Sequence, residues 1–241
     1  MVNFIEKARY DFEDLRALVS FLRSENGCPW DREQTHASIR RNLLEEAYEA
    51  CEGIDLDNAD LMKEEFGDVL LQSVFHVSIE EDAGRFTMED VIDGVCKKLI
   101  FRHPHLFAGV KTEDWDWEEM KKQEKGVQSQ AQVLDGVARS LPALIRAEKL
   151  NSKLMKMGYA WPTPGDAVAY AQTALSHLTA ADDPAKALGS ALIALTGACK
   201  AMGLEAEEAL HAGCEAMISR FAAAEETGKA ADTSAICQFL P

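Results

Sequence analysis

Residues 58–83 read NADLMKEEFGDVLLQSVFHVSIEEDA, and their apolar side chains recur with the period of a helix. On a helical projection, apolar side chains cover almost the whole circumference: Leu61, Phe66, Val69, Leu70, Leu71, Val74, Phe75 and Val77. The remaining sector is polar and is filled, at spacings of 3, 4 and 4 residues, by Glu65, Asp68, Gln72 and His76. Because such a polar stripe is costly to bury without partners, we expect a neighbouring helix to supply them.

The preceding predicted helix, residues 34–53, carries further acids. Together the two helices contain five clustered carboxylates: Glu45, Glu46, Glu49, Glu65 and Asp68. Each cluster includes an i,i+3 pair, which projects from one side of its helix: Glu46 with Glu49, and Glu65 with Asp68. Antiparallel packing would bring these four acids together, where like charges repel unless a divalent cation compensates them. Oxygen ligands without His or Cys favour Mg²⁺ or Mn²⁺ over zinc or copper.

Two other interpretations of these acids were weighed. A lone EExxE pattern is most often the solvated face of a surface helix, but the second acid pair lies on a helix too apolar to be one. A di-iron bundle requires ExxH pairs, whereas Glu46 is followed by Glu49 and Glu65 by Asp68. The metal site is therefore the favoured interpretation.

Five further residues are candidates for substrate binding. Lys98 and Arg102 are four residues apart and could clamp phosphate oxygens, or they could be a solvated basic patch that complements a helix C-terminus. His105, in the run RHPH, could bind phosphate or cap carbonyl groups. Trp30 could stack on a base or anchor its loop on the core. Asn42, one turn before the first acids, is a weaker candidate for a sugar or phosphate contact.

The apolar spacing is helical nearly throughout, so the predicted fold is all-α. Helices are expected at about 4–24, 34–53, 58–83, 87–102, 112–125, 141–157, 165–181, 184–202 and 204–227. Thr87 and Asp90 form a capping box at the start of the fourth, and Gly203 ends the eighth. These signals predict a domain at 1–125, a linker at 126–140, a second domain at 141–228 and a flexible tail at 229–241.

Composition limits the class of protein. The 241 residues are 47% hydrophobic and carry a net charge of −16, of which −13 (16 bases, 29 acids) belongs to residues 1–125. This acidity is unlike that of a nucleic-acid binder. The six cysteines form no CxxC, so we expect reduced thiols. The first residues lack the apolar core of a signal peptide, and the apolar run Ala187–Cys199 is too short to span a bilayer, so no membrane contact and a cytoplasmic location are expected.

The two halves resemble each other as a repeat. In the first, Leu15–Leu22 leads through a loop to Trp30, and in the second Leu141–Leu154 leads to Trp161. Gly189-Ser190 stands where Gly67-Asp68 stands, and no Asp or Glu occurs in the windows that correspond to the two acid clusters. If the repeat is real, the second half is a scaffold or dimerisation element. The alternative is two unrelated helical hairpins in an alanine-rich chain.

Several motifs, taken in order, resemble the MazG family of nucleoside triphosphate pyrophosphohydrolases, part of the all-α NTP pyrophosphohydrolase superfamily. The motifs are GCPWD at 27–31, LEEAYE at 44–49, EFGD at 65–68, RHPH at 102–105, SLPAL at 140–144 and GYAW at 158–161. The resemblance implies two tandem MazG-like helical bundles, the second degenerate, in a homodimer. It also implies Mg²⁺-dependent cleavage between the α and β phosphates of a broad or house-cleaning range of nucleotides.

Carried onto this chain, the resemblance makes Glu46, Glu49, Glu65 and Asp68 the metal ligands. Lys98 and Arg102 take the phosphate-clamp positions. Two-domain members commonly keep an acidic cluster in each half, and this chain departs from that pattern. The second clamp has also lost its lysine, because Ala216 stands four residues before Arg220.

The expected catalytic residues are Glu45 and Glu46. Glu45 is surplus to a four-ligand shell, and we hypothesise that it orients the attacking water as general base or binds a second ion. Two other functions stay open at this point. One is a catalytically weak nucleotide- or metal-sensing helical module that regulates a partner. The other is a purely structural helical protein with fortuitous acids.

Overall fold

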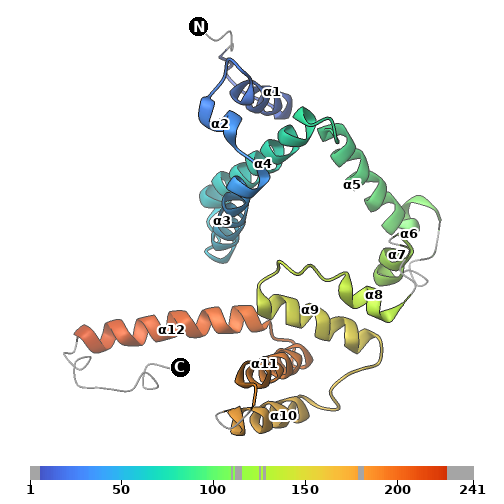
Figure 1. Cartoon of the computed structure of the whole chain (residues 1–241), viewed down its shortest axis with the longest axis vertical. Helices are drawn as coiled ribbons and strands as arrows, with labels where there is room; N and C mark the ends of the chain where they lie inside the picture. Colours follow the sequence, from blue (N-terminus) through green and yellow to red (C-terminus); the bar gives the residue numbers. More distant parts are fainter. Residues whose placement is uncertain are drawn as a thin grey trace. The chain divides into compact units, whose positions relative to one another are not determined.

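The fold is seen in a computed structural model, which describes residues 6–109, 111, 116–124, 126, 129–178 and 182–226 (Figure 1). Within these ranges the regular elements are helices, and no strand occurs. The all-α prediction is confirmed. The tail predicted at 229–241 lies outside the described residues.

The helices of the first half are α1 (Phe12–Arg23), α2 (Pro29–Glu33), α3 (His36–Asp55), α4 (Ala59–Asp82), α5 (Met88–Arg102), α6 (Pro104–Phe107) and α7 (Trp117–Glu124). Those of the second half are α8 (Gln130–Asp135), α9 (Ala143–Lys156), α10 (Pro164–Ser176), α11 (Pro184–Ala201) and α12 (Ala206–Glu226).

The observed bounds correct the predicted ones at a few termini. α1 starts at Phe12 rather than near residue 4. The reason is a capping box, in which the side chain of Asp11 accepts the backbone N–H of Asp14 and fixes the first turn of the helix. The short helices α2 and α8 were not predicted, since each is too brief to show a period. The capping box at Thr87 is present as predicted.

The chain divides into an N-terminal unit, Met1–Met120, and a C-terminal unit, Lys121–Pro241. The segment predicted as a linker is partly structured. It contains α8, which Ser129 caps, and Val137, of which only 4% is exposed. A buried valine shows that this end of the segment belongs to the C-terminal unit.

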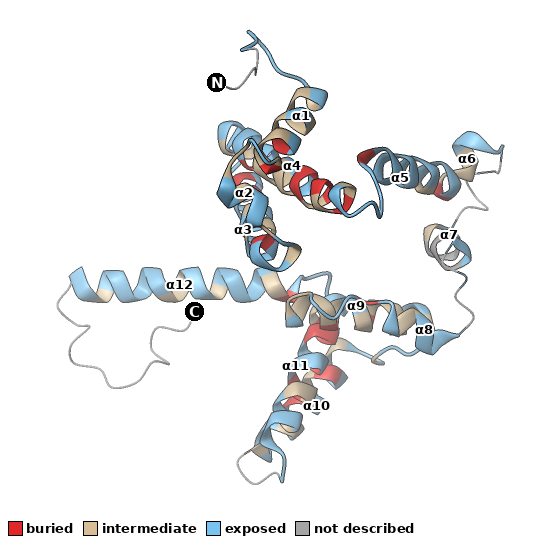
Figure 2. Cartoon of the chain, turned by 45° about the horizontal axis from the view of Figure 1, so that its top comes forward, coloured by how far each residue is buried: buried red, intermediate tan, exposed pale blue. Residues whose placement is uncertain are grey.

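In the N-terminal unit α1, α3 and α4 enclose one core. Its buried members are Val19, Ile39, Val74, Phe75, Val77 and Met88. Figure 2 shows the buried residues of α4 concentrated towards its C-terminal end. The N-terminal half of α4 is more open than the sequence predicted, because Phe66 and Leu70 are 52% and 42% exposed.

The last turn of α4 holds three consecutive acids, which oppose the helix dipole. Each is paired with an arginine, two of them from α1 and one from the turn after α4. Arg85 donates to Glu80, Arg16 to Glu81, and Arg23 donates to Asp82 at 2.8 Å. These pairs offset the unfavourable charge and join α1 to the end of α4.

In the C-terminal unit α11 packs against α9 and α10 around small side chains, among them Ala171, Ala191 and Ala194. Asn151 of α9 donates to the hydroxyl of Thr196 and to the carbonyl of Ile193, both at 2.9 Å. These buried hydrogen bonds fix the register of α9 on α11. In the described ranges no single helix is long and apolar enough to cross a membrane; α11 and α12, bent by 101°, meet that criterion only when taken as a pair.

Candidate metal centre and phosphate-binding residues

The turn between α3 and α4 determines where the acidic side chains lie. Thr35 caps α3 through a capping box, and Asn58 caps α4 by accepting the N–H of Leu61. Between the helices Asp57 adopts a φ of 49°, which closes α3 tightly. A Cβ on Gly53 would lie 3.0 Å from the backbone nitrogen of Met62, so glycine lets the two helices approach closely. α3 and α4 therefore run antiparallel side by side (Figure 1).

This packing brings together three of the predicted ligands, Glu46, Glu49 and Glu65, which we call the acidic cluster. One carboxylate oxygen from each lies within 4.8 Å of the others. Glu65 is only 8% exposed, and its Oε2 is buried without a hydrogen-bond partner among the described residues. An orphaned buried oxygen beside two other carboxylates fits a hard divalent cation, which takes oxygen ligands.

Burial and mutual repulsion raise the pKa of two members of the acidic cluster. Burial, followed by the charges of Asp68, Glu49 and Glu65, raises the pKa of Glu46 above its ordinary value. Burial and then Glu49 raise the pKa of Glu65 in the same direction. No Lys or Arg of the described residues forms an ion pair with the cluster, so its mutual repulsion stands uncompensated by protein groups.

The fourth predicted ligand and the predicted base lie at the edge of the cluster. Asp68 is half-buried, and its charge raises the pKa of both Glu46 and Glu65, although its oxygens are not part of the 4.8 Å group. Glu45 is exposed and accepts from Arg41 Nε at 2.9 Å. Its carboxylate is therefore held by a surface ion pair. Glu45 is next to Glu46 in the sequence, but its contact is with Arg41 and not with the acidic cluster.

The polar stripe of α4 continues beyond the predicted residues. His76 contacts His36 of α3, and His36 in turn contacts Glu80, one further turn along the stripe. Neither His36 nor Glu80 was predicted from the sequence to be part of this stripe. Glu80 extends the spacing of four residues after His76, so the stripe itself was the signal that could have found it.

The two residues of the predicted phosphate clamp, Lys98 and Arg102, lie in different environments. Lys98 is half-buried on α5 and has no hydrogen-bond or ion-pair partner in the described part of the chain. Arg102 is only 9% exposed, and its guanidinium lies 5.1 Å from the ring centroid of Trp117. In Figure 1, α5 extends away from α3, which carries two residues of the acidic cluster.

Two histidines follow α5, and the roles predicted for this segment are phosphate binding and capping of helix carbonyls. His103 Nδ1 lies 2.6 Å from the carbonyl oxygen of Leu99, a contact that caps the helix. His103 also packs on Trp117, with ring centroids 5.4 Å apart. His105 is half-buried beside His103, at 5.7 Å between centroids, and its capacity to bind phosphate stays a prediction.

Trp30 and Asn42 occupy accessible positions. Trp30 lies on α2 with 59% of its surface exposed, so it does not anchor its loop on the core, the second role considered for it. The indole is accessible for stacking on a planar ligand, and this role stays a prediction. Asn42 is half-buried on α3, one turn before Glu46.

Comparison with known proteins identifies the chain. Residues 34–107 match the model of the MazG nucleotide pyrophosphohydrolase domain. The chain is 37% identical to the nucleoside triphosphate pyrophosphohydrolase/pyrophosphatase MazG of Thermotoga maritima, over 89% of this chain and 86% of that protein. The chain belongs to the MazG family. It is also 36% identical to the nucleoside triphosphate pyrophosphohydrolase of Escherichia coli, over 82% and 80% of the two chains. A relative of the same name from Mycolicibacterium smegmatis is 42% identical over 60% of this chain and 46% of its own length.

Within this MazG chain the family match covers α3 to α6 and therefore contains the whole acidic cluster. In the C-terminal unit, Gly189 and Ser190 of α11 stand where the predicted repeat places Gly67 and Asp68 of α4, so the acid of this pair is replaced by serine. The described carboxylates that could together hold a metal ion are thus those of the MazG-matching region.

Proposed function

We propose that this chain is a nucleoside triphosphate pyrophosphohydrolase that cleaves the bond between the α and β phosphates with Mg²⁺ or Mn²⁺. The observation that carries the proposal is the acidic cluster, with its buried, unpartnered Glu65 oxygen. The names of the relatives support the reaction. Glu46, Glu49 and Glu65 would hold the cation, and Asp68 completes the ligand set from the adjacent turn of α4.

The chemistry follows from charge. A bound Mg²⁺ would neutralise the triphosphate and lower the pKa of a water. Glu46, Glu49 and Glu65 would hold that cation, because the bare carboxylates repel a triphosphate. Glu45 accepts the proton of the attacking water while the water oxygen bonds to the α phosphorus and pyrophosphate leaves. For this step Glu45 must leave Arg41, an exposed ion pair that costs little to break.

Lys98 and Arg102 are proposed to bind the departing phosphates, because both are basic residues of α5 within the region that matches the family model. Trp30, Asn42 and His105 are proposed to contact the base, the sugar and the phosphates. The substrate range is proposed to include non-canonical nucleotides, and the site of action is proposed to be the cytoplasm, where nucleoside triphosphates are made and used.

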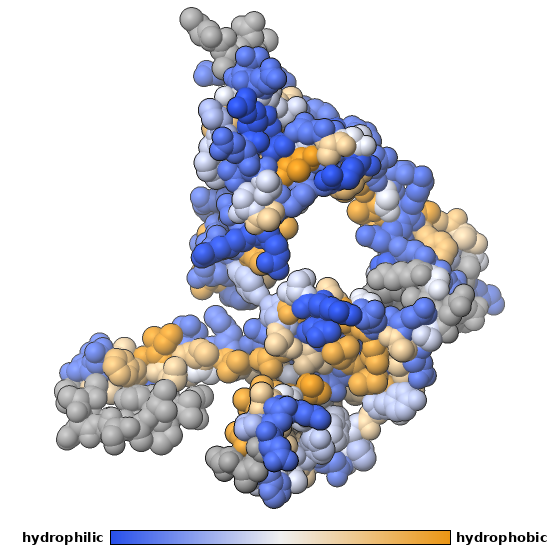
Figure 3. All heavy atoms as spheres, in the orientation of Figure 1, coloured by the Kyte–Doolittle hydropathy of each residue, from blue (hydrophilic) through white to orange (hydrophobic). Residues whose placement is uncertain are grey.

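A homodimer is proposed on the basis of exposed apolar surface in the N-terminal unit. Large apolar side chains of α5 are 39–49% exposed: Val91, Ile92, Val95, Leu99, Ile100 and Phe101. Figure 3 shows hydrophobic surface over this part of the unit. A continuous apolar helix face is a common feature of a subunit interface. Sedimentation should show a dimer that Val95→Asp weakens, and a monomer at micromolar concentration for the native chain would contradict it.

The direct test incubates the purified chain with each (d)NTP and several base-modified analogues, with and without Mg²⁺. Resolution of monophosphate plus pyrophosphate from diphosphate plus phosphate identifies the bond cleaved. The expected products are monophosphate and pyrophosphate, formed only with the cation. Diphosphate release, or equal rates for native chain and a Glu46→Gln, Glu65→Gln double variant, would overturn the proposal.

A second function is favoured by two observations. Arg102 is packed on Trp117, and the second half lacks the acidic cluster that two-domain members of the family commonly keep, as expected of a catalytically weak regulatory module that senses nucleotide or metal. Mg²⁺-dependent nucleotide binding without turnover in the same incubation would support this module over the enzyme.

A further inference from the structure

The corner between α4 and α5, residues 83–87, determines where α5 points. α4 ends in a Schellman motif, in which Arg85 N–H bonds to the Glu80 carbonyl and Gly84 N–H to that of Glu81, both at 3.0 Å. Gly84 supplies the left-handed φ of 64° that this motif requires. Such a turn changes the direction of the chain sharply. The angle of the next helix is then determined by the contacts of its first turn, which we call its root.

Among the described residues, α5 is packed mainly at its two ends, and its last turn meets Trp117 through Arg102. Met88 at its first turn and Arg102 at its last are its buried residues. Figure 2 shows the helix between them exposed along its length. The groups that hold the first turn therefore have most of the influence on where Lys98 and Arg102 lie, about two to four helical turns away.

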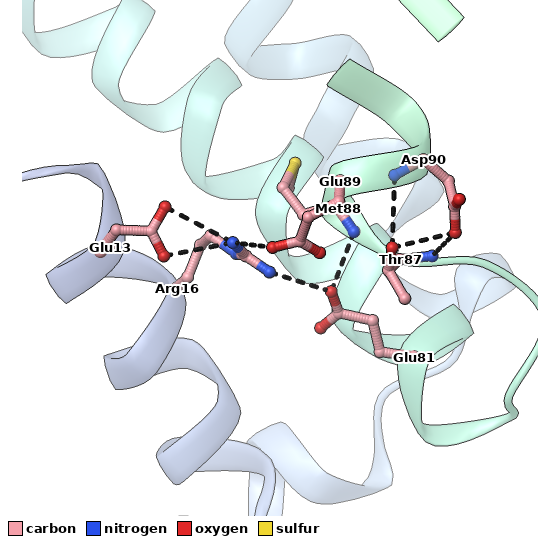
Figure 4. Close-up of polar contacts among 7 residues, drawn as sticks. All are labelled: Glu13, Arg16, Glu81, Thr87, Met88, Glu89 and Asp90. Carbon is pink, nitrogen blue, oxygen red and sulfur yellow. Dashed lines mark hydrogen bonds and ion pairs between the residues drawn. The ribbon is translucent and has the colours of Figure 1, made fainter. Parts of the chain in front are cut away.

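One guanidinium joins three helices at this root (Figure 4). Arg16 of α1 donates to Glu89 of α5 at 2.6 Å and to Glu81 of α4 at 3.4 Å. The same Glu81 oxygen accepts the backbone N–H of Met88, the first residue of α5, at 3.0 Å. Glu13, also on α1, contributes a further carboxylate at 3.2 Å. Arg16 thus links α1 to the first turn of α5 both directly and through Glu81.

In the C-terminal unit, the corner between α11 and α12 is also contacted by a charged side chain of an earlier helix, and this side chain is acidic. Glu148 of α9 accepts the backbone N–H of Ala206, the first residue of α12. Thus in each unit a charged side chain of an earlier helix contacts the first turn of a later one: Arg16 of α1 reaches Glu89 of α5, and Glu148 of α9 reaches Ala206 of α12.

We propose that Arg16 is a positioning residue of the reaction: it fixes the direction of α5 and thereby places Lys98 and Arg102 for the phosphates. This inference rests on the proposed function of those two residues. Arg16 contacts neither the acidic cluster nor the clamp, so it acts through α5 alone. An ion-pair network that spans three helices can define geometry even where a single surface pair adds little stability.

The kinetic test compares Arg16→Met, which keeps the stem and removes the charge, with Arg16→Lys, which keeps the charge. Arg16→Met should raise KM for the triphosphate about fivefold or more and change kcat by less than about twofold, because the lost geometry belongs to substrate binding. Arg16→Lys should recover most of the loss. Binding of Mn²⁺ alone, followed by electron paramagnetic resonance, should equal that of the native chain in both variants.

Partner specificity is tested with Glu89→Gln and the Arg16→Met, Glu89→Gln double variant. If the two residues act together, the double variant should raise KM no more than about twofold beyond Arg16→Met. Arg139→Met, which breaks an exposed pair with Asp135 in the C-terminal unit, is the matched control and should keep the native KM.

Hydrogen exchange measured on the same proteins separates the inference from the proposed function. In Arg16→Met the amides of α5 should exchange about fivefold faster or more, while those of α3 and the N-terminal half of α4 keep the native rates. Absence of pyrophosphate release by the native chain would end the proposed function, and exchange would still decide whether Arg16 holds α5. Native exchange in α5, or a rise in KM that follows thermal stability and that Lys does not rescue, would overturn the role of Arg16.

Discussion

Nδ1 of His36 lies 2.8 Å from Nδ1 of His76, and the two rings stack with 5.0 Å between their centroids. Two ring nitrogens at this distance share one hydrogen, so one donates and the other accepts. His36 also uses Nε2 to contact Glu80, which Arg85 holds from the α4–α5 corner. This arrangement ties the start of α3 to the far end of α4.

The histidine pair predicts loss of stability in mild acid. Burial, and then His36, lowers the pKa of His76 below its ordinary 6.5, so the folded state binds this proton less readily than the unfolded state. The contribution of neutral His76 to stability is therefore present above pH 6.5, and it is lost as the pH falls through the pKa of His76 in the folded state. Urea unfolding at pH 7.5 and 5.5 should therefore show a larger loss for the native chain than for His76→Gln. Equal losses in the two proteins would rule the pair out as the cause.

Glu80 titrates in a lower range and should be separable. Hydrogen bonds from Arg85, together with His36, lower its pKa from 4.5 to about 2. Its contribution to stability is present above pH 4.5 and is lost as pH falls towards 2. Glu80→Gln should thus flatten the unfolding free energy between pH 4.5 and 2.5 and leave the change between pH 7.5 and 5.5 in place. A change confined to the upper range would contradict this assignment.

Glu65→Gln should have opposite effects without and with metal. The raised pKa of Glu65 means that its charged form is unfavourable in the metal-free fold, so the neutral amide should raise Tm in a chelator. Saturating Mg²⁺ at about 100 times Kd should stabilise the native chain by about 2.7 kcal/mol and the variant far less. Glu52→Gln, an exposed acid of α3 outside the cluster, is the control and should respond to Mg²⁺ as the native chain does. Calorimetry in both buffers measures the effect, and a native-like Mg²⁺ response in Glu65→Gln would remove Glu65 from the site.

Glu45→Gln tests the predicted base. If Glu45 takes the proton of water, kcat should fall at least about 100-fold with little change in Mn²⁺ affinity. Arg41→Gln, which removes its surface partner without removing the carboxylate, should keep most of the activity. A fall of no more than about threefold in Glu45→Gln would exclude it from the mechanism.

The two units should respond separately to a packing change in α11. A Cβ on Gly197 would lie 2.5 Å from Trp161 Nε1 and 3.2 Å from Asn151 Oδ1, so Gly197→Ala should destabilise the C-terminal unit by about 1–3 kcal/mol. At Gly189 of the same helix a Cβ meets nothing within 4 Å, and Gly189→Ala should stabilise by roughly 0.5–1 kcal/mol. Mn²⁺ affinity should stay native in both variants. Denaturant unfolding followed by circular dichroism distinguishes the two effects, and equal changes would contradict this packing.

The sequence predicted the helices most reliably where local signals agree. Capping residues such as Thr35, Asn58 and Thr87 fix helix starts through bonds to backbone groups a few residues away, and these signals can be read without a structure. The spacing along α4 predicted a polar stripe, and three of the predicted ligands do converge. Start sites were missed where apolar periodicity continued past a cap, as in the residues before Asp11.

Sequence alone determined that acids from two antiparallel helices would meet, because helical period and a short turn fix which side chains share a face. Only the tertiary structure decided which of those acids form the tight group, that Trp117 covers Arg102, and that Arg16 reaches Glu89 across 73 residues. The reason is physical: period and caps act within a few residues of the chain, whereas burial, cation–π contacts and ion pairs depend on how distant helices cross.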